Sequence, residues 1–314
     1  MNQWKISAGT AGVLGKKKIR CPVLPTTAYI MLGENCKNRC QFCSQSQESV
    51  AKRNRLSRIT WPSFFMEEVV DHLSTAYVRG DIKRICFQVV NDQANWENTM
   101  QSLAEMKKRN LKAICVSNYF RHVGQAKALL EAGAEKVCIA LDGATAAIYE
   151  QAKKSDWHER WTLLTECAFA LPGKITTHLI VGLGETEEEM VKRIADCMRR
   201  GIGVGLFAFT PIQGTPWSWR QPPSIGQYRR IQIAYQLLQM GYGEEVIDYQ
   251  GGKICHYDVP ALPKIVSDGK AFETTGCPDC NRPFYNERPG GVIYNYPRKL
   301  TKDEIEQAIQ ESLL

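Results

Sequence analysis

Long apolar runs are absent from this chain of 314 residues. The longest runs fall well short of the about 18 residues that cross a bilayer. The start, MNQWKISAGTAGVLGKKKIR, has no apolar core long enough for a signal peptide. Internal repeats and low-complexity linkers are missing as well. We therefore expect a cytoplasmic globular protein with no membrane partner.

A strong excess of one charge is also missing. The net charge is +7, and its local concentrations are residues 16–18 and the group Arg53, Arg55 and Arg58. No basic stretch is interleaved with stacking aromatic residues, as a single-strand groove would require. We do not expect nucleic acid as a partner. The basic groups are solvated surface, or alternatively a field that steers an acidic protein substrate or RNA.

Cysteine, by contrast, is abundant, with 12 residues and no secretory signal, which favours reduced thiols and metal ligands over disulfides. Cys36, Cys40 and Cys43 form a C-x3-C-x2-C array, and Phe42 precedes the last thiol. Three soft ligands from one loop suit a 4Fe-4S cluster, in which one iron keeps an open position. Structural zinc and unrelated thiols are the alternative interpretations.

Short apolar runs alternate with amphipathic stretches along most of the chain, which is typical of βα units around a parallel sheet. Eight strands with intervening helices predict a single α/β domain, a (β/α)8 barrel whose catalytic groups follow the carboxyl ends of the strands. We place its core at residues 22–285, a short arm at 1–21 and an extension at 286–314. The expected strands are 27–32, 84–90, 113–116, 136–140, 176–181, 205–209, a short piece near Val246, and 272–274.

The cysteine loop, placed directly after the apolar run TTAYIML, resembles the signature loop of the radical S-adenosylmethionine (SAM) enzymes. The resemblance implies a TIM-type barrel whose first six βα units carry the SAM site. It also implies that Cys36, Cys40 and Cys43 ligate the catalytic cluster and that Phe42 contacts the cofactor. In that family SAM is cleaved to a 5'-deoxyadenosyl radical, which takes a hydrogen atom from the substrate.

Further SAM contacts follow from resemblance to biotin synthase. The turn IVGLGET resembles its equivalent beside the adenine, which assigns Val181 and Leu183 as packing contacts. Asp142, at the end of the fourth expected strand, resembles the Asp that meets the ribose or substrate. Gln88 stands where the family has a Gly-Gly-Glu-like stretch, which this chain lacks. Lys153, Lys154 and Arg160 are candidates for the cation that meets the SAM carboxylate, but surface charge is the role we expect of each.

A second cluster is the next expectation. Biotin synthase holds an interior 2Fe-2S cluster with three Cys and an Arg; Cys86 and Cys115 match two of these, but the third position is Thr176 or Thr177. We therefore interpret Cys86, Cys115 and Cys138 as small buried apolar residues. Cys277 and Cys280, a C-x2-C pair, and Cys255 instead predict three ligands of an auxiliary 4Fe-4S cluster at the barrel mouth. The fourth ligand is Cys21, His256 or a hydroxyl.

The runs NRPFYNERPGG and YNYPR resemble the two-component lipoyl synthases, and this resemblance covers nearly the whole chain. It implies a sulfurtransferase that inserts sulfur from the auxiliary cluster at C6 or C8 of a protein-bound octanoyl chain. The implied partners are an octanoylated carrier (a lipoyl domain or the glycine-cleavage H protein), a second radical SAM subunit, and an electron donor such as ferredoxin. The alternatives are biotin synthase, a radical SAM enzyme that uses its second metal site for electron transfer, and a non-enzymatic electron carrier.

Overall fold

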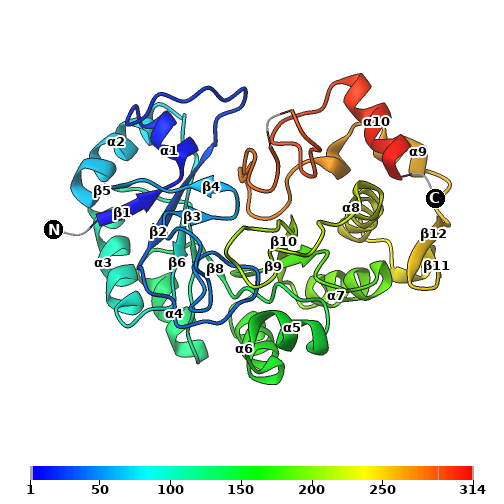
Figure 1. The fold of residues 1–314 in the computed structure, drawn as a ribbon, viewed down its shortest axis with the longest axis horizontal. Helices are drawn as coiled ribbons and strands as arrows, with labels where there is room; N and C mark the ends of the chain where they lie inside the picture. The colour runs from blue at the N-terminus through cyan, green and yellow to red at the C-terminus, as the bar shows by residue number, and fades with distance from the viewer. Residues whose placement is uncertain (1–2, 289, 313–314) are drawn as a thin grey trace.

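A computed structural model describes residues 3–288 and 290–312 of the protein. Its centre is an eight-stranded sheet in the order β10-β9-β8-β7-β6-β2-β1-β5 (Figure 1). Across the described residues, every helix is too short or too polar for a membrane span. The strands are β1 (Gln3–Ile6), β2 (Thr27–Leu32), β3 (Arg55–Leu56), β4 (Ile59–Thr60), β5 (Ser63–Phe65), β6 (Arg84–Val89), β7 (Ile114–Ser117), β8 (Lys136–Cys138), β9 (Ile175–Val181), β10 (Gly203–Ala208), β11 (Ile247–Gln250) and β12 (Lys253–Tyr257). The helices are α1 (Ala8–Val13), α2 (Met66–Val78), α3 (Asn95–Lys108), α4 (Val123–Glu131), α5 (Ala146–Lys153), α6 (Trp157–Ala170), α7 (Glu187–Arg199), α8 (Ile225–Gln239), α9 (Leu262–Val266) and α10 (Lys302–Ser312), with 3-10 turns η1 (Glu244–Val246) and η2 (Lys270–Phe272).

Six neighbouring strands, β2 and β6 to β10, run parallel, which confirms the predicted α/β fold with a barrel-type parallel sheet. Strand geometry sends alternate side chains to opposite faces. In β2, Ile30 and Leu32 therefore join the main apolar core beneath the helices, whereas Tyr29 and Met31 join a separate cluster on the interior face. The same alternation orients the side chains of the functional site.

Part of the expected N-terminal arm, residues 3–6, is a strand of the main sheet. β1 pairs antiparallel with both β2 and β5. Trp4 and Ile6 are buried, and the Ser7 side chain caps α1 by accepting from the amide of Thr10. The apolar side chains in this short segment provide the burial that holds it in place.

The seventh and eighth expected strands do not extend the sheet. The segment near Val246 is η1, and the following β11 pairs with β12 in a separate hairpin that turns at Gly251 and Gly252. Phe272 ends η2 and is fully buried in a second apolar core formed with α8. The buried ring of Phe272 and a single β-bridge between Glu273 and Tyr296 take the place of the expected strand.

A loop, residues 274–282, takes the place of the missing eighth strand. At one end, the Thr275 hydroxyl accepts from the Leu206 amide on the free edge of β10, at 2.8 Å. At the other end, the Asp279 carbonyl accepts from the Thr26 hydroxyl, at 2.7 Å, just before β2. The loop therefore links the edge of β10 to the amino end of β2, and it carries Cys277 and Cys280 with it.

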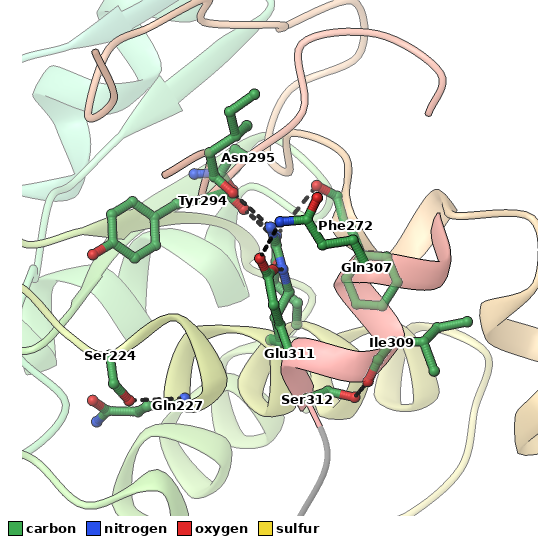
Figure 2. A network of polar contacts seen from close by, with 12 residues as sticks. Ser224, Gln227, Phe272, Tyr294, Asn295, Gln307, Ile309, Glu311 and Ser312 are labelled. Atoms are coloured by element: carbon green, nitrogen blue, oxygen red, sulfur yellow. Dashed lines mark hydrogen bonds and ion pairs between the residues drawn. The ribbon is translucent and has the colours of Figure 1, made fainter. Parts of the chain in front are cut away.

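Helix α10 is fastened to α8 through the buried Arg229. Arg229 Nε donates to Glu311 at 2.9 Å, and the two terminal nitrogens of Arg229 donate to the carbonyls of Tyr294 and Ile293 at 2.7 and 2.6 Å. Figure 2 shows Glu311, Tyr294 and Phe272 around the polar contacts of this region. The ion pair and the carbonyl contacts explain how α10 stays against α8.

Candidate active site and interior thiols

The cysteine loop begins at the carboxyl end of β2 and is anchored to the chain that follows β6. The Glu34 amide donates to Asp92 Oδ2 at 3.0 Å, and the Lys37 amide donates to the Asn91 carbonyl at 2.7 Å. Gly33 has a φ of 87°, and a Cβ there would approach Asp92 to 2.5 Å. Glycine is therefore required at the point where the loop leaves the strand.

The three loop thiols face one cavity. Cys36 and Cys43 are half-buried and Cys40 is buried. Burial raises the pKa of Cys40 to about 11, against the opposing charge of Lys153, and raises the pKa of Cys43 to about 12. Without a metal the thiols of Cys40 and Cys43 are neutral at pH 7, and a soft cation stabilises their thiolate forms.

Single-ion metal sites are not formed by the described residues. Within 3–288 and 290–312, no group of three or more Cys, His, Asp or Glu side chains could hold one metal ion. An iron-sulfur cluster differs, because each thiolate binds a different iron and the sulfurs need not converge on one point. The loop is therefore compatible with a cluster.

The cavity has a volume of about 890 Å³. It extends from the cysteine loop over the carboxyl ends of the parallel strands to the C-terminal loop. Catalytic cavities at this end are general for parallel barrels. The functional side chains in its wall include Cys36, Cys40, Cys43, Asp142, His178 and Arg282.

Asp142 and Lys153 form a buried ion pair in the cavity wall, with 9% and 13% of their side chains exposed. Burial acts to lower the pKa of Lys153, but the charges of Asp142 and Cys40 raise it above the usual value. Lys153 comes from α5, which periodicity did not predict. The expectation that it lies at the surface is wrong, because the turn from β8 into α5 directs it inward.

Arg160 is a second buried cation that sequence reasoning placed at the surface. Its guanidinium lies 4.3 Å from the centre of the Tyr119 ring, and Nη1 donates to the Phe120 carbonyl at 3.3 Å. It lines the cavity with 8% of its surface exposed. Lys154, the next candidate, is exposed at the end of α5. The cavity wall therefore offers two buried cations, Lys153 and Arg160.

The turn after β9 lies near the cavity but with a different residue facing it. Ile180 lines the cavity, whereas Val181 is fully buried in the main core on the opposite face. Leu183 packs in a small cluster with Phe42 and Ile180. Strand alternation places Ile180, not Val181, toward the site, so the packing contact assigned to Val181 is wrong. The contact assigned to Leu183 stays a prediction.

Gln88 lines the cavity, but its amide points to the sheet interior. Nε2 donates to Cys86 Sγ at 2.9 Å. Both side chains lie on the interior face of β6, because Ile85 and Phe87 between them belong to the main core. Gln88 therefore connects the cavity floor with a thiol below it.

Cys86 and Cys115 lie opposite each other on β6 and β7, outside the main apolar core. Cys115 Sγ is 3.6 Å from Cys277 Sγ. Hydrogen bonds with the thiols of Cys277 and Cys86 raise the pKa of Cys115, while the contact with Cys115 and the charge of Arg84 lower that of Cys277 to about 7. Cys115 and Cys138 are buried and Cys86 is half-buried, as expected, but the sequence did not predict the contact with Cys277.

Cys280 joins the same interior region. Its Sγ lies 3.4 Å from the Tyr29 hydroxyl, and Tyr29 is the register partner of Cys86. Arg282 packs 3.9 Å from the centre of the Phe207 ring, and its Nη2 donates to the Leu206 and Thr275 carbonyls at 3.1 and 2.9 Å. Sequence reasoning missed Arg282, because only the long-range course of the loop brings it inside.

Cys255 and Cys21 do not share this region. Cys255 is exposed on β12, in the hairpin at the far edge of the molecule (Figure 1). His256 beside it is also exposed. The Cys21 thiol donates to the carbonyl of Val23 in its own loop, at 2.9 Å. The structure thus separates Cys255 from Cys277 and Cys280, and the three do not form the ligand set expected from sequence.

The profile of the Radical SAM superfamily matches residues 30–197, more than half of the chain. This chain belongs to the radical SAM superfamily. The matched region begins in β2, includes the cysteine loop and ends in α7. No curated protein matches the chain.

Solved structures of radical SAM enzymes share the fold. The FeFe-hydrogenase maturase HydG from Carboxydothermus hydrogenoformans is 14% identical with a TM-score of 0.55, covering 92% of this chain and 66% of that one. Methylornithine synthase (PylB) is 15% identical with a TM-score of 0.51, covering 67% and 62%. SuiB of Streptococcus suis bound to S-adenosylmethionine is 10% identical with a TM-score of 0.50, covering 69% and 48%. The chain thus spans about half to two thirds of the length of these proteins, and the likeness concerns the fold alone.

Membership of the radical SAM superfamily makes the chain an enzyme and implies a 4Fe-4S cluster with SAM. The residues present fit both groups. Three thiols from one loop open onto the cavity, and two buried cations line its wall beside them. A cluster with an open iron and a ligand that carries a carboxylate match this set of donors and charges.

Proposed function

We propose that this radical SAM enzyme is a sulfurtransferase of the lipoyl synthase type, one subunit of a two-component system. The observation that carries the proposal is a second group of thiols close to the cavity that holds the first. Cys36, Cys40 and Cys43 lie in the cavity wall, and Cys280 contacts the hydroxyl of Tyr29, which lines the same cavity. Cys277 lies beside Cys280 in a neighbouring pocket. The reductive cleavage of SAM needs only one cluster. The second group of thiols therefore supports a second cluster, which we propose as the sulfur source.

The first group holds the catalytic cluster in this proposal. When bound, the cluster and SAM supply the 5'-deoxyadenosyl radical that removes a hydrogen atom from the substrate. The buried cations Lys153 and Arg160 then provide positive charge for the methionyl carboxylate. Asp142 holds Lys153 in place through their ion pair, and Leu183 and Phe42 pack behind the cofactor.

The proposed reaction exchanges a C–H bond at C6 or C8 of an octanoyl chain for a C–S bond. The hydrogen would leave in 5'-deoxyadenosine, and the second cluster would supply the sulfur and take up the remaining electron. The chain's own part is to hold the acyl chain and exclude water. Apolar side chains in the cavity wall, among them Met31, Trp61 and Phe209, provide this environment.

An octanoylated carrier protein, a lipoyl domain or an H protein, is the proposed substrate. The rim of the cavity carries the exposed basic residues Lys37, Arg39 and Arg121. Such a rim steers an acidic carrier to the cavity. A second radical SAM subunit and a ferredoxin-type electron donor complete the proposed set of partners, in the cytoplasm.

The test is an anaerobic reaction of the reconstituted enzyme with SAM, a reductant and an octanoyl-lysyl peptide or octanoylated lipoyl domain. We expect 5'-deoxyadenosine together with a product whose mass has increased by one sulfur atom. The Cys36→Ala, Cys40→Ala, Cys43→Ala variant is the control and yields neither product. Formation of 5'-deoxyadenosine with no sulfur in the octanoyl chain, even with the second subunit present, would contradict the proposal.

One observation favours a second candidate, biotin synthase or another radical SAM enzyme acting on a small molecule. Cys86 and Cys115 lie on the interior face of the sheet, as the resemblance to biotin synthase implies. A biotin synthase would insert sulfur into a small molecule, whereas another small-molecule radical SAM enzyme would use the second metal site for electron transfer. Turnover of a small substrate, with no thiolation of an octanoylated carrier, distinguishes both from the lipoyl proposal, and the presence or absence of sulfur in the product separates the two.

A further inference from the structure

We propose that Cys86, Cys115, Cys277 and Cys280 together ligate the second cluster, a 4Fe-4S cluster in the interior of the sheet below the SAM cavity. The inference extends the proposed function, because it names the ligands of the second cluster, but it does not depend on the identity of the substrate. Four thiolates suit either a 2Fe-2S or a 4Fe-4S cluster, and zinc is the competing metal.

The first half of the site comes from two neighbouring parallel strands. Cys86 and Cys115 are direct register partners, so their Cα atoms lie on adjacent strands about 4.8 Å apart. Alternation sends both side chains to the interior face, and their thiols are hydrogen-bonded. These two positions are held rigidly by the sheet.

The second half comes from the loop that replaces the eighth strand. Cys277 and Cys280 form a tight turn, in which the Cys280 amide donates to the Cys277 carbonyl at 3.1 Å. Arg84 on β6 donates to the Pro278 carbonyl at 2.7 Å, which fixes this turn against the strand that carries Cys86. Four thiols from three separate parts of the chain thus meet inside the sheet.

Two positive charges lie beside the thiols, although Cys86 and Cys280 also pack against the apolar cluster that contains Tyr29 and Met31. Arg84 has 3% of its surface exposed, and its charge acts on both Cys277 and Cys115. It also pairs with Glu135 at 3.1 Å. Arg282 is half-buried beside Cys280, and its Nη2 donates to the Leu206 and Thr275 carbonyls. Positive charge beside the sulfurs favours anionic ligands, and the thiolates of a cluster fit it.

Hydrogen-bond donors reach the sulfurs from the cavity side. Gln88 donates to Cys86 Sγ, and the Tyr29 hydroxyl contacts Cys280 Sγ. Contacts of this kind orient cluster ligands and adjust their reduction potential. Since Gln88, Tyr29 and Arg282 also line the SAM cavity, they form the layer between the two proposed clusters.

A separate pocket of about 400 Å³ reaches Cys277 and Cys280 from the other side. Thr26, Tyr235 and Asp279 are among its lining residues. Cys277 and Cys280 are therefore reached from the amino end of the sheet, on the side away from the SAM cavity. A cluster that is consumed as a reagent needs such an entry path for reassembly.

Cys138 is the fifth thiol of the region and is not assigned as a ligand. Its Sγ lies 3.5 Å from His178 Nε2, and it is hydrogen-bonded with Thr176 and Ser117. These partners satisfy it without a metal. Cys138→Ala is therefore a matched control inside the same region, and Cys255→Ala and Cys21→Ala are controls outside it.

The experiment measures iron, acid-labile sulfide and zinc in anaerobically reconstituted protein. The wild type should hold about eight irons, and the Cys36→Ala, Cys40→Ala, Cys43→Ala variant about four. In that variant, adding Cys86→Ala, Cys115→Ala, Cys277→Ala or Cys280→Ala should each remove or alter the remaining cluster in its EPR spectrum. Adding Cys138→Ala, Cys255→Ala or Cys21→Ala should leave it unchanged.

Alkylation of the wild-type protein keeps the inference testable if a variant fails to fold. With clusters bound, Cys86, Cys115, Cys277 and Cys280 should resist a thiol reagent, and chelation of iron should expose them. Zinc without sulfide, a Cys115–Cys277 disulfide in reduced anaerobic protein, or loss of the cluster only in Cys255→Ala or Cys21→Ala would overturn the inference. A confirmed four-thiol cluster without octanoyl thiolation would instead contradict only the proposed function.

Discussion

Cys115 Sγ and Cys277 Sγ lie 3.6 Å apart although 162 positions separate the two residues in the chain. Cys115 belongs to the rigid parallel sheet, and Cys277 belongs to the loop that closes the sheet beside β10. The contact therefore depends on the whole chain between them having folded. Because of this contact, Cys115 on β7 belongs to a candidate metal site.

We expect Arg282 to act as a positioning residue whose positive charge adjusts the reduction potential of the second cluster. In Arg282→Met the loss of a positive charge should lower the reduction potential of the second cluster, on the order of 60 mV, the one-electron equivalent of about 1.4 kcal/mol. Arg282→Lys should restore most of the potential, because it retains the charge. Redox titration followed by EPR checks this, with iron content as the control. An equal shift in both variants would indicate that geometry, not charge, matters.

Lys153 is expected to support SAM binding. Lys153→Met leaves Asp142 as a buried carboxylate without its counter-charge, and SAM affinity should fall at least about tenfold, ~1.4 kcal/mol. Equilibrium dialysis with the cluster-loaded protein measures the Kd. The exposed neighbour Lys154→Met should change it by no more than about twofold. Equal losses in both variants would argue against a specific role for the buried pair.

Arg229 is expected to be the main anchor of α10. Arg229→Ala removes the partner of Glu311 and leaves the Ile293 and Tyr294 carbonyls without their donor, which should cost about 3 kcal/mol in the free energy of unfolding. Arg298→Ala breaks an exposed pair with Glu304 and should cost less than about 1 kcal/mol. Denaturant unfolding compares the two, and similar losses would contradict the assignment.

Glu185 is expected to make stability fall as pH rises. Burial raises its pKa to about 7, against the backbone amides of Gly182 and Leu183 that favour the ionised form. Because the folded pKa exceeds the unfolded value, its contribution is fully present below about pH 4.5 and is lost as pH rises through 7. The loss should reach about 2 to 3 kcal/mol, and Glu185→Gln should remove it. Thermal unfolding of both proteins from pH 5 to 8 provides the measurement; parallel curves would refute this assignment.

The sequence by itself determined the family, the cysteine loop and the six parallel strands. These features are local: the spacing of Cys36, Cys40 and Cys43 lies within one loop, and the strands follow from short apolar runs that bury one face against helices. The prediction failed at the seventh and eighth strands, because pairing depends on which edges are free. Phe272 is buried instead in the second apolar core, against α8.

The tertiary structure decided which side chains share a site. Register and alternation turned Ile180 rather than Val181 toward the cavity, and the helix after β8 buried Lys153. The closing loop brought Cys277, Cys280 and Arg282 to Cys86 and Cys115, while the β11–β12 hairpin left Cys255 in solvent. None of this is visible in composition or spacing, since each contact joins segments whose separation in sequence says nothing about their separation in space.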